Sequence, residues 1–409
     1  MSASSPKRYT LRLLGTVIAV LLLTVFLTTL VNPVRVTPTP WSLDLFNRYR
    51  VVEHFERTAK SGYIRSGDWD AAIFGSSRMD IAIDPAAPAF AGYHAVNLSL
   101  SAGHLTENIE MLRYAMAHEH LGMVMYGVDL MDLSTPVKIP KSDFYSSPLA
   151  IDGGRLDHEL QYLIGITSLK HAVTVISRTI RGKPSEHSPS GHWIKLKNKP
   201  DQRRDAERSA LSQAFALFRT RREADSIDLQ KADMMREVLA LCRSSNSRLI
   251  IVIPPSHAIF NASLHLLGDP DPVFRTEREF LTRLVAEDNA HHPNQPVFTL
   301  WDFDDFHPLN CEPVPADPAR AMKEWVDAIH ACDSIGAIMS GAALGHPSER
   351  PDSAGYGYEL TPENLDSRIA NIQSGYERYT RENADELAWL RTVLDHLKSE
   401  ASDLLPSDD

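Results

Sequence analysis

A long apolar run near the N-terminus is the strongest hydropathy feature of the chain. Residues 13–31 read LLGTVIAVLLLTVFLTTLV and contain no charged side chain. Nineteen helical residues span roughly 28 Å at about 1.5 Å each, close to the hydrocarbon thickness of a bilayer. Lys7, Arg8 and Arg12 precede the run. The positive-inside rule therefore predicts a cytoplasmic N-terminus over residues 1–12 and an extracytoplasmic location for the rest of the chain.

A cleaved signal peptide is the rival interpretation of this run. The run is longer than a usual signal h-region, and Val31-Asn32-Pro33 offers no small-x-small cleavage site. We therefore predict an uncleaved single-pass anchor over 13–31, in the inner (cytoplasmic) membrane with the main domain in the periplasm. Residues 32–41, NPVRVTPTPW, predict a stiff extended spacer. They begin a lead-in segment, 32–66, whose residues 42–60 have a helical pattern.

Short apolar runs alternate with amphipathic segments from residue 70 onward. The runs predict strands at residues 70–74, 94–100, 123–130, 248–253 and 297–303. Helices are predicted at about 106–118, 229–242 and 272–287. In the first of these, Leu105, Ile109 and Leu112 recur at the spacing of one helical face. Helices that alternate with apolar strands indicate a mainly parallel sheet with both faces covered.

Two segments break this alternation. Residues about 134–225 are polar and rich in glycine, proline and basic side chains, which predicts an insertion that forms a lid, a partner surface or a solvated excursion. Residues 346–409 form a C-terminal extension. Within it, Thr361-Pro362-Glu363 predicts a helix start, and the leucine, isoleucine and tyrosine spacing beyond it predicts two amphipathic helices packed on the domain or on a partner protein.

The amino-acid composition and net charge argue against two classes of protein. The 409 residues are 43% hydrophobic and carry a formal charge of −11, which argues against a nucleic-acid-binding protein. The three cysteines have no CxxC spacing, which argues against a structural zinc site. Cys311 and Cys332 are the candidates for one disulfide, and Cys242 is then left over.

The candidate chemistry begins where the first predicted strand ends. Ser77 follows the strand 70–74 directly, at a sheet edge where α/β proteins bind ligands. A serine nucleophile also needs a base, a group that orients the base, and donors for the oxyanion. His330 and, three residues before it, Asp327 are candidates for the base and its orienting group. The plain alternative is a strand that ends in a small-residue turn.

Four blocks occur in a fixed order along the chain. They are Gly75-Ser76-Ser77 after the first strand, Asn97-Leu98-Ser99-Leu100-Ser101 after the second, Gly127-Val128-Asp129 after the third, and the late Asp327-Ala328-Ile329-His330. This series resembles the SGNH (GDSL-like) hydrolase superfamily, in its membrane-anchored extracytoplasmic branch related to polysaccharide O-acetylation proteins. The resemblance covers an SGNH-like domain over residues 67–345.

The resemblance implies a flavodoxin-like three-layer α/β/α sandwich with serine acyl chemistry and no cofactor. By position, Ser77 is similar to the nucleophile, His330 to the base and Asp327 to its orienting group. The resemblance also implies an oxyanion hole made by the main-chain N–H groups of Ser77 and of Ala102 or Gly103.

The chain departs from the family pattern at Asp129, which stands where the family has an asparagine oxyanion donor. An ionised carboxylate only accepts hydrogen bonds and would repel an oxyanion. Either Asp129 is protonated, or it binds a substrate hydroxyl, or the site is not a normal hydrolase. Asn97 is a further candidate substrate-binding residue. Arg78 could meet an anionic substrate or pair with a nearby acid, and His257 could line the pocket.

These features give two hypotheses. The first is an anchored serine esterase or O-acyltransferase, with acetyl as the expected acyl group, that acts on a cell-envelope or exported polysaccharide. The second is a catalytically lapsed module that binds glycan or scaffolds a membrane assembly through its insertion and C-terminal helices. Two further features are closer to ordinary structure. The acidic and histidine cluster 302–307 is predicted to be a solvated turn more than a metal site, and Trp325 to be a packed wall.

Overall fold

The computed structural model describes residues 6–35, 42–53, 55–150, 162–194, 209–216, 227–317 and 319–403. The chain forms two compact units. One consists of Met1–Asp68 with Pro140–Gly191, and the other of Trp69–Ile139 with His192–Asp409. All the sequence-predicted site residues belong to the second unit. Part of the predicted insertion therefore belongs with the N-terminal segment, and the insertion is not one excursion from the sheet domain.

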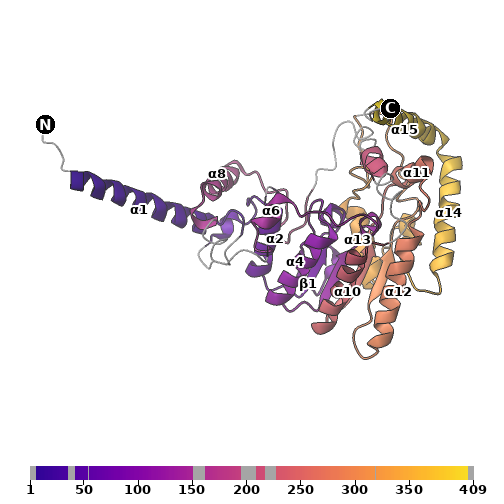
Figure 1. Cartoon of the computed structure of the whole chain (residues 1–409), viewed down its shortest axis with the longest axis horizontal. Helices are drawn as coiled ribbons and strands as arrows, with labels where there is room; N and C mark the ends of the chain where they lie inside the picture. The colour runs from indigo at the N-terminus through magenta and orange to yellow at the C-terminus, as the bar shows by residue number, and fades with distance from the viewer. Residues whose placement is uncertain are drawn as a thin grey trace, which may run out of the picture. The chain divides into compact units, whose positions relative to one another are not determined.

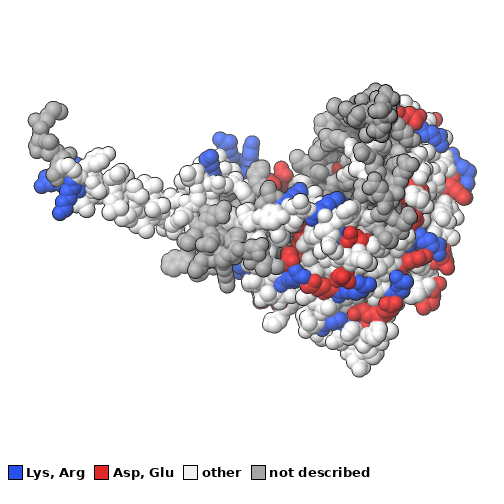
Figure 2. All heavy atoms as spheres, viewed as in Figure 1, with Lys and Arg blue, Asp and Glu red and all other residues white. Residues whose placement is uncertain are grey.

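The first unit is built around the predicted apolar helix. Helix α1 covers Pro6–Val31 and is long and apolar enough to span a membrane or to serve as a signal sequence. Helix α2 (Glu56–Ser66) packs on α6 (Ser142–Tyr145), and α8 (Ile166–Arg181) packs on α1. Figure 2 shows charged side chains at the N-terminal end of α1 and an uncharged surface along the helix beyond them.

The chain turns back after α1, so the predicted extended spacer is wrong for residues 32–35. Asn32 and Arg35 have positive φ angles of 42° and 55° and form a turn. Leu43 donates its N–H to Leu30 O (3.0 Å), and Val51 donates to Pro33 O (3.1 Å), which pins the following segment to the helix end. Residues 36–41 of the predicted spacer lie outside the described part of the chain.

The second unit contains a mostly parallel six-stranded sheet, as the alternation predicts. Its strands are β1 (Ala71–Phe74), β2 (Ala95–Asn97), β3 (Met123–Gly127), β4 (Arg248–Ile253), β5 (Thr299–Asp302) and β6 (Tyr358–Glu359). The order across the sheet is β2-β1-β3-β4-β5-β6, and β6 alone is antiparallel to its neighbour. The central strands are continuous apolar runs because helices bury both of their faces.

The crossovers place helices on the two faces of this sheet. Helices α4 (Leu105–His118), α10 (Leu229–Ser244) and α12 (Arg275–His291) run along the strands in Figure 1, and α4 packs on α10. Helix α13 (Asp333–Leu344) packs instead on the short α3 (Ser77–Ala82). In the order β2-β1-β3 the chain leaves β1 toward β2 and then returns past β1 to β3, so the carboxyl ends of β1 and β3 form the switch point at which open α/β sheets bind ligands.

The C-terminal extension packs on the sheet domain and adds a strand to its sheet. Its strand β6 pairs with β5, Trp301 opposite Glu359. Helix α14 (Leu365–Glu382) packs on α12, and α15 (Ala384–Asp403) packs on α11 (Ala258–Leu267). The predicted start at Thr361 is wrong, since Asn364 Oδ1 accepts the Thr361 N–H (2.9 Å) and closes a turn before the helix.

Candidate active site

A sharp strand-to-helix turn presents Ser77 at the carboxyl end of β1. Ser77 is the first residue of α3, and Ser76 caps this helix by accepting the Arg78 N–H at 3.3 Å. Gly75 has a φ of +147°, and a Cβ atom on it would lie 2.6 Å from Met79 Cγ. On Gly127 of β3 a Cβ would lie 2.2 Å from the same atom. Both glycines therefore allow α3 to pack closely over the strand ends.

The Asp-x-x-His segment brings its two side chains to the serine. Val326 N–H donates to His330 O at 2.8 Å, which closes a tight turn over residues 326–330. Trp325 and Ala331, on either side of this turn, form an antiparallel β-bridge. Asp327 Oδ1 accepts the main-chain N–H of His330 at 3.0 Å, so the turn itself orients the carboxylate. The spacing of three residues works here through a loop and not through a helix.

Ser77, His330 and Asp327 form one hydrogen-bonded series. Ser77 Oγ lies 2.8 Å from His330 Nε2, and His330 Nδ1 lies 2.8 Å from both carboxylate oxygens of Asp327. Because a carboxylate only accepts hydrogen bonds, Nδ1 carries the proton and Nε2 is free to accept the hydroxyl proton. The side chains of His330 and Asp327 are 13% and 11% exposed, so the pair is sheltered from water. This arrangement can perform nucleophilic catalysis with general-base assistance.

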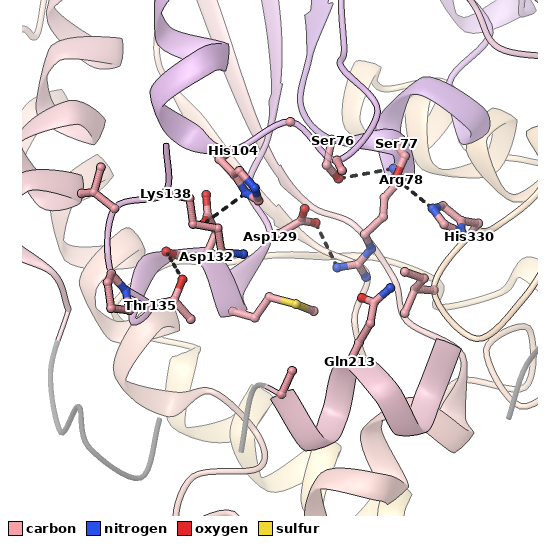
Figure 3. Close-up of a pocket in the computed structure, with 17 residues that line it drawn as sticks. Ser76, Ser77, Arg78, His104, Asp129, Asp132, Thr135, Lys138, Gln213 and His330 are labelled. Atoms are coloured by element: carbon pink, nitrogen blue, oxygen red, sulfur yellow. Dashed lines mark hydrogen bonds and ion pairs between the residues drawn. The ribbon is translucent and has the colours of Figure 1, made fainter. Parts of the chain in front are cut away.

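A cavity of about 680 Å³ lies beside the serine, a size typical of small-molecule sites. Figure 3 shows Ser77 and His330 on one side and His104, Asp132, Thr135 and Lys138 on the other, with Arg78 and Asp129 between them. A substrate in this cavity would therefore contact both the serine and a polar wall formed by residues after β2 and β3.

The two predicted donors after β2 differ in how the structure uses their main-chain N–H groups. Gly103 donates its N–H to Leu100 O at 2.8 Å, so it is already used within a turn. Ala102 has a φ of +46°, a conformation that alanine seldom adopts and that is often associated with functional sites. Both residues line the cavity.

Arg78 pairs with Asp129, the second of the two roles weighed for the arginine. Arg78 Nη1 lies 3.0 Å from Asp129 Oδ1, with side-chain exposures of 7% and 19%. Arg78 Nη2 donates to Pro254 O (2.7 Å) and to Ser256 Oγ (2.9 Å). This guanidinium joins the carboxyl ends of β1, β3 and β4. It also places a positive charge against the carboxylate that by itself would oppose an oxyanion.

Two predicted pocket residues lie elsewhere. Asn97 is fully buried, and its amide donates to Met79 O and Ile83 O while Oδ1 accepts the Ser99 N–H. Asn97 therefore fixes α3 to β2. Its side-chain oxygen and nitrogen already make hydrogen bonds within the protein, so it does not bind a substrate. His257 is also fully buried: its Nε2–H donates to Glu312 O at 2.6 Å, and its Nδ1 caps α11. Burial lowers the pKa of His257, so it serves as a neutral structural group.

The cavity also contains residues that the sequence patterns did not indicate. His104 and Asp132 approach each other at 3.8 Å, and Asp132 is further paired at 3.0 Å with the buried Nζ of Lys231. Burial lowers the pKa of His104 and Asp132 opposes that shift. Gln213 reaches the cavity from the segment 209–216. His104 adjoins the second block and Asp132 lies three residues after Asp129, but nothing in the sequence connects Gln213 to the site.

The cluster 302–307 is not a solvated turn. Asp302 is fully buried between Arg278 Nε and Arg368 Nε, each 2.9 Å from Oδ2. Burial alone would raise the pKa of Asp302, but the two guanidinium charges hold it well below its usual range. Arg368 also binds Asp305 at 2.6 Å. The acids of this cluster are therefore occupied by arginines.

Two remaining predictions concern single side chains. Trp325 is fully buried and donates its indole N–H to Leu309 O at 2.8 Å, which confirms it as a packed wall. Cys311 and Cys332 are free thiols, as is Cys242, so the predicted disulfide is wrong.

No protein-family model matches this chain. A search of the curated proteins finds no significant match either. A functional assignment therefore depends on the geometry described above together with the motif resemblance.

Proposed function

We propose that this chain is a membrane-anchored serine esterase or O-acyltransferase, with acetyl as the acyl group, acting on a cell-envelope or exported polysaccharide. The observation that carries the proposal is the hydrogen-bonded series from Ser77 through His330 to Asp327 at the edge of a cavity. The strand order 2-1-3-4-5 of the parallel strands supports a flavodoxin-like sandwich of the SGNH type.

In the proposed reaction, Ser77 Oγ attacks the carbonyl carbon of an ester while His330 Nε2 takes the hydroxyl proton. The main-chain N–H groups of Ser77 and Ala102 stabilise the oxyanion. As the intermediate collapses, the ester C–O bond breaks and His330 protonates the departing alcohol. The acyl group then remains on Ser77. Water or a sugar hydroxyl attacks it next, giving up a proton to His330 and restoring the free serine.

Asp129 and Arg78 act in this proposal as one unit. The carboxylate holds the guanidinium at the carboxyl ends of the strands, and the guanidinium compensates the negative charge near the oxyanion. The departure from the family's asparagine is thus matched by an arginine directly after the nucleophile. Arg78 is a positioning residue here, because it acts through the electrostatics of Asp129 and the strand ends.

The anchor supports the extracytoplasmic part of the proposal. Helix α1 has the length and apolar composition of a membrane span, and Lys7, Arg8 and Arg12 lie at its N-terminal end. By the positive-inside rule these charges keep the N-terminus in the cytoplasm and put the chain that follows α1 in the periplasm. Polysaccharides of the envelope are the substrates available on that side of the inner membrane.

The second candidate function is a lapsed module that binds glycan or scaffolds a membrane assembly. The presence of Asp129 favours this alternative, because the family has an asparagine there that donates a hydrogen bond to the oxyanion and a carboxylate cannot donate one. Under this alternative the cavity binds an acylated glycan without turnover.

The experiment is an assay of the purified full-length protein with an acetyl ester, in the presence and absence of oligosaccharide acceptors. Wild type is expected to release acetate or to acetylate the acceptor, and Ser77→Ala to do neither. Ser367→Ala, on the exposed side of α14, is the matched control and should behave as wild type. Two results together would favour the lapsed module: a wild type that hydrolyses none of the esters, and a glycan affinity that is the same in Ser77→Ala as in wild type.

A further inference from the structure

Helix α8 packs one of its faces against the end of α1. Ala172 and Val175 of α8 are fully buried with Val31, and Leu27 and Ile176 border the same cluster. Just before α8, Leu163 O accepts the Thr28 hydroxyl at 2.6 Å. These contacts all lie within the first unit. They fix α8 beside the last turns of the proposed membrane span.

A second apolar face of α8 is left exposed. Ile166, Val173 and Ile180 are 74%, 57% and 80% exposed. Successive members are seven residues apart, so at about 100° per residue they fall on one stripe that drifts by roughly 20° each time. We refer to these three side chains as the isoleucine–valine stripe. Three large apolar side chains that are aligned on one helix and all exposed mark an interaction surface.

Basic side chains border this stripe. Lys170 and Arg181 are exposed and, at about 100° per residue, lie within roughly 60° of Ile166 around the helix. Figure 2 shows lysine and arginine side chains gathered over α8. The helix has no acidic residue in its sequence, ITSLKHAVTVISRTIR. An exposed apolar stripe next to cations is the pattern of a helix that lies in a membrane interface.

The position along α1 favours lipid as the occupant of this surface. Residues of α1 are largely exposed up to Leu23, and its buried residues are Thr24, Thr28 and Val31. The chain thus begins to cover α1 at its last turns, where a span of this length leaves the hydrocarbon. Helix α8 contacts the same turns. An apolar stripe at the end of the membrane span would contact lipid acyl chains, and the neighbouring lysine and arginine side chains would contact the lipid phosphates of the same leaflet.

We propose that α8 is an interfacial helix that inserts the isoleucine–valine stripe into the outer leaflet of the membrane crossed by α1. The inference rests on the membrane span in the proposed function and not on the acyl chemistry. It gives the chain a second point of attachment, since one side of the first unit would be held at the lipid surface as well as by the anchor.

The test uses nitroxide labels on the full-length protein in vesicles of phosphatidylethanolamine and phosphatidylglycerol. The label is placed at Val173→Cys and, as a matched control, at the adjacent exposed Thr174→Cys, both in a Cys311→Ser background. Both positions are exposed, so neither label requires repacking of the core. Collision rates with oxygen and with a water-soluble nickel chelate then measure immersion in lipid. The oxygen-to-nickel ratio is expected to be severalfold higher at 173 than at 174.

Two results would overturn the proposal. Equal and strong nickel access at both positions would put α8 in water. Spin–spin broadening at 173 that disappears on dilution with unlabelled protein would identify a second copy, and not lipid, as the occupant. Failure of the anchor itself is detected separately, because alkaline carbonate would then release the protein from native membranes. Loss of esterase activity has no bearing on any of these readouts.

Discussion

At the residue scale, Asp327 holds the histidine in one tautomer. Both of its oxygens lie 2.8 Å from His330 Nδ1, and Oδ1 also accepts two main-chain N–H groups from Ile329 and His330. Asp327→Asn keeps these main-chain contacts but offers an amide to Nδ1. It is expected to lower kcat by roughly 10³- to 10⁴-fold.

Steady-state hydrolysis of an acetyl ester measures this effect, with Asp233→Asn on the exposed side of α10 as the control. A loss of less than about tenfold (~1.4 kcal/mol) would show that the carboxylate does not orient the base.

The ion pair of Arg78 and Asp129 predicts the opposite effect of Asp129→Asn on activity from the one that the motif resemblance implies. If Asp129 merely opposed the oxyanion, Asp129→Asn would raise kcat. If it positions Arg78, the change removes a charged hydrogen bond worth about 1.5–3 kcal/mol and lowers activity about tenfold or more.

A double-mutant cycle of Asp129→Asn with Arg78→Gln separates the two cases. Coupling between the two changes is expected, and additive effects on kcat/KM would contradict a shared role.

Some site residues could be predicted from the sequence because the chemistry follows strand order. Ser77, Ala102 and Asp129 each come just after a parallel strand, and such strands end at one sheet edge. The sequence does not show that Arg78 pairs with Asp129, because the two residues lie 51 positions apart. Asn97 and His257 lie outside the cavity, because position at a strand end does not reveal whether a side chain turns inward to bond the end of a helix.

At the element scale, Asp302 connects β5 to α12 and α14. Two buried guanidinium groups lie 2.9 Å from its Oδ2. Asp302→Asn leaves both cations without their shared counter-charge and is expected to lower the free energy of unfolding by about 3–5 kcal/mol.

Chemical denaturation measures this change, and the exposed pair of Asp366 with Arg275 is a matched control. Asp366→Asn should have little effect. Equal small effects of both substitutions would show that the buried cluster does not stabilise the packing of α14.

The burial of His265 leads to a prediction of how the free energy of unfolding depends on pH. His265 stacks on Tyr376 at 3.7 Å between ring centroids, joining α11 to α14, and burial lowers its pKa to about 4. Between pH values of about 6.5 and 4 the unfolded chain therefore binds a proton that the folded chain does not. The free energy of unfolding should fall as the pH falls through this window.

His265→Phe keeps an aromatic ring and is expected to flatten this fall. His118→Phe is the matched control, because His118 stacks on Tyr114 at the surface of α4. Unfolding curves at several pH values measure the slope. A slope that is unchanged in His265→Phe would contradict the assignment.

The sequence predicts the elements that have a strong hydrophobic pattern and not those that lack one. Strands β3 and β4 are continuous apolar runs and were found within a few residues. Helix α13 was missed because it contains Gly336 and Gly341, which are poor helix formers. A Cβ on Gly336 would lie 1.7 Å from Ala82 O, so the glycine is needed for contact with α3. Strand β6 has two residues, too few for a periodic signal.

At the scale of the whole molecule, the order of segments along the chain does not show which segments form a compact unit together. Residues from Pro140 to Gly191 form one compact unit with the N-terminal segment, although the sheet domain flanks them on both sides in sequence. Hydrophobic periodicity reports local structure and says little about which distant segments share a core. The C-terminal extension likewise belongs to the sheet because of β6 and Arg368, which no local pattern indicates.

The central claim is that Ser77 is an activated nucleophile in an anchored protein. The most direct measurement is the intact mass of the full-length protein after treatment with a fluorophosphonate, with peptide mapping of the adduct. Wild type is expected to gain one adduct on Ser77, and Ser77→Ala to gain none. An unmodified wild type, or an adduct that persists in Ser77→Ala, would contradict the account.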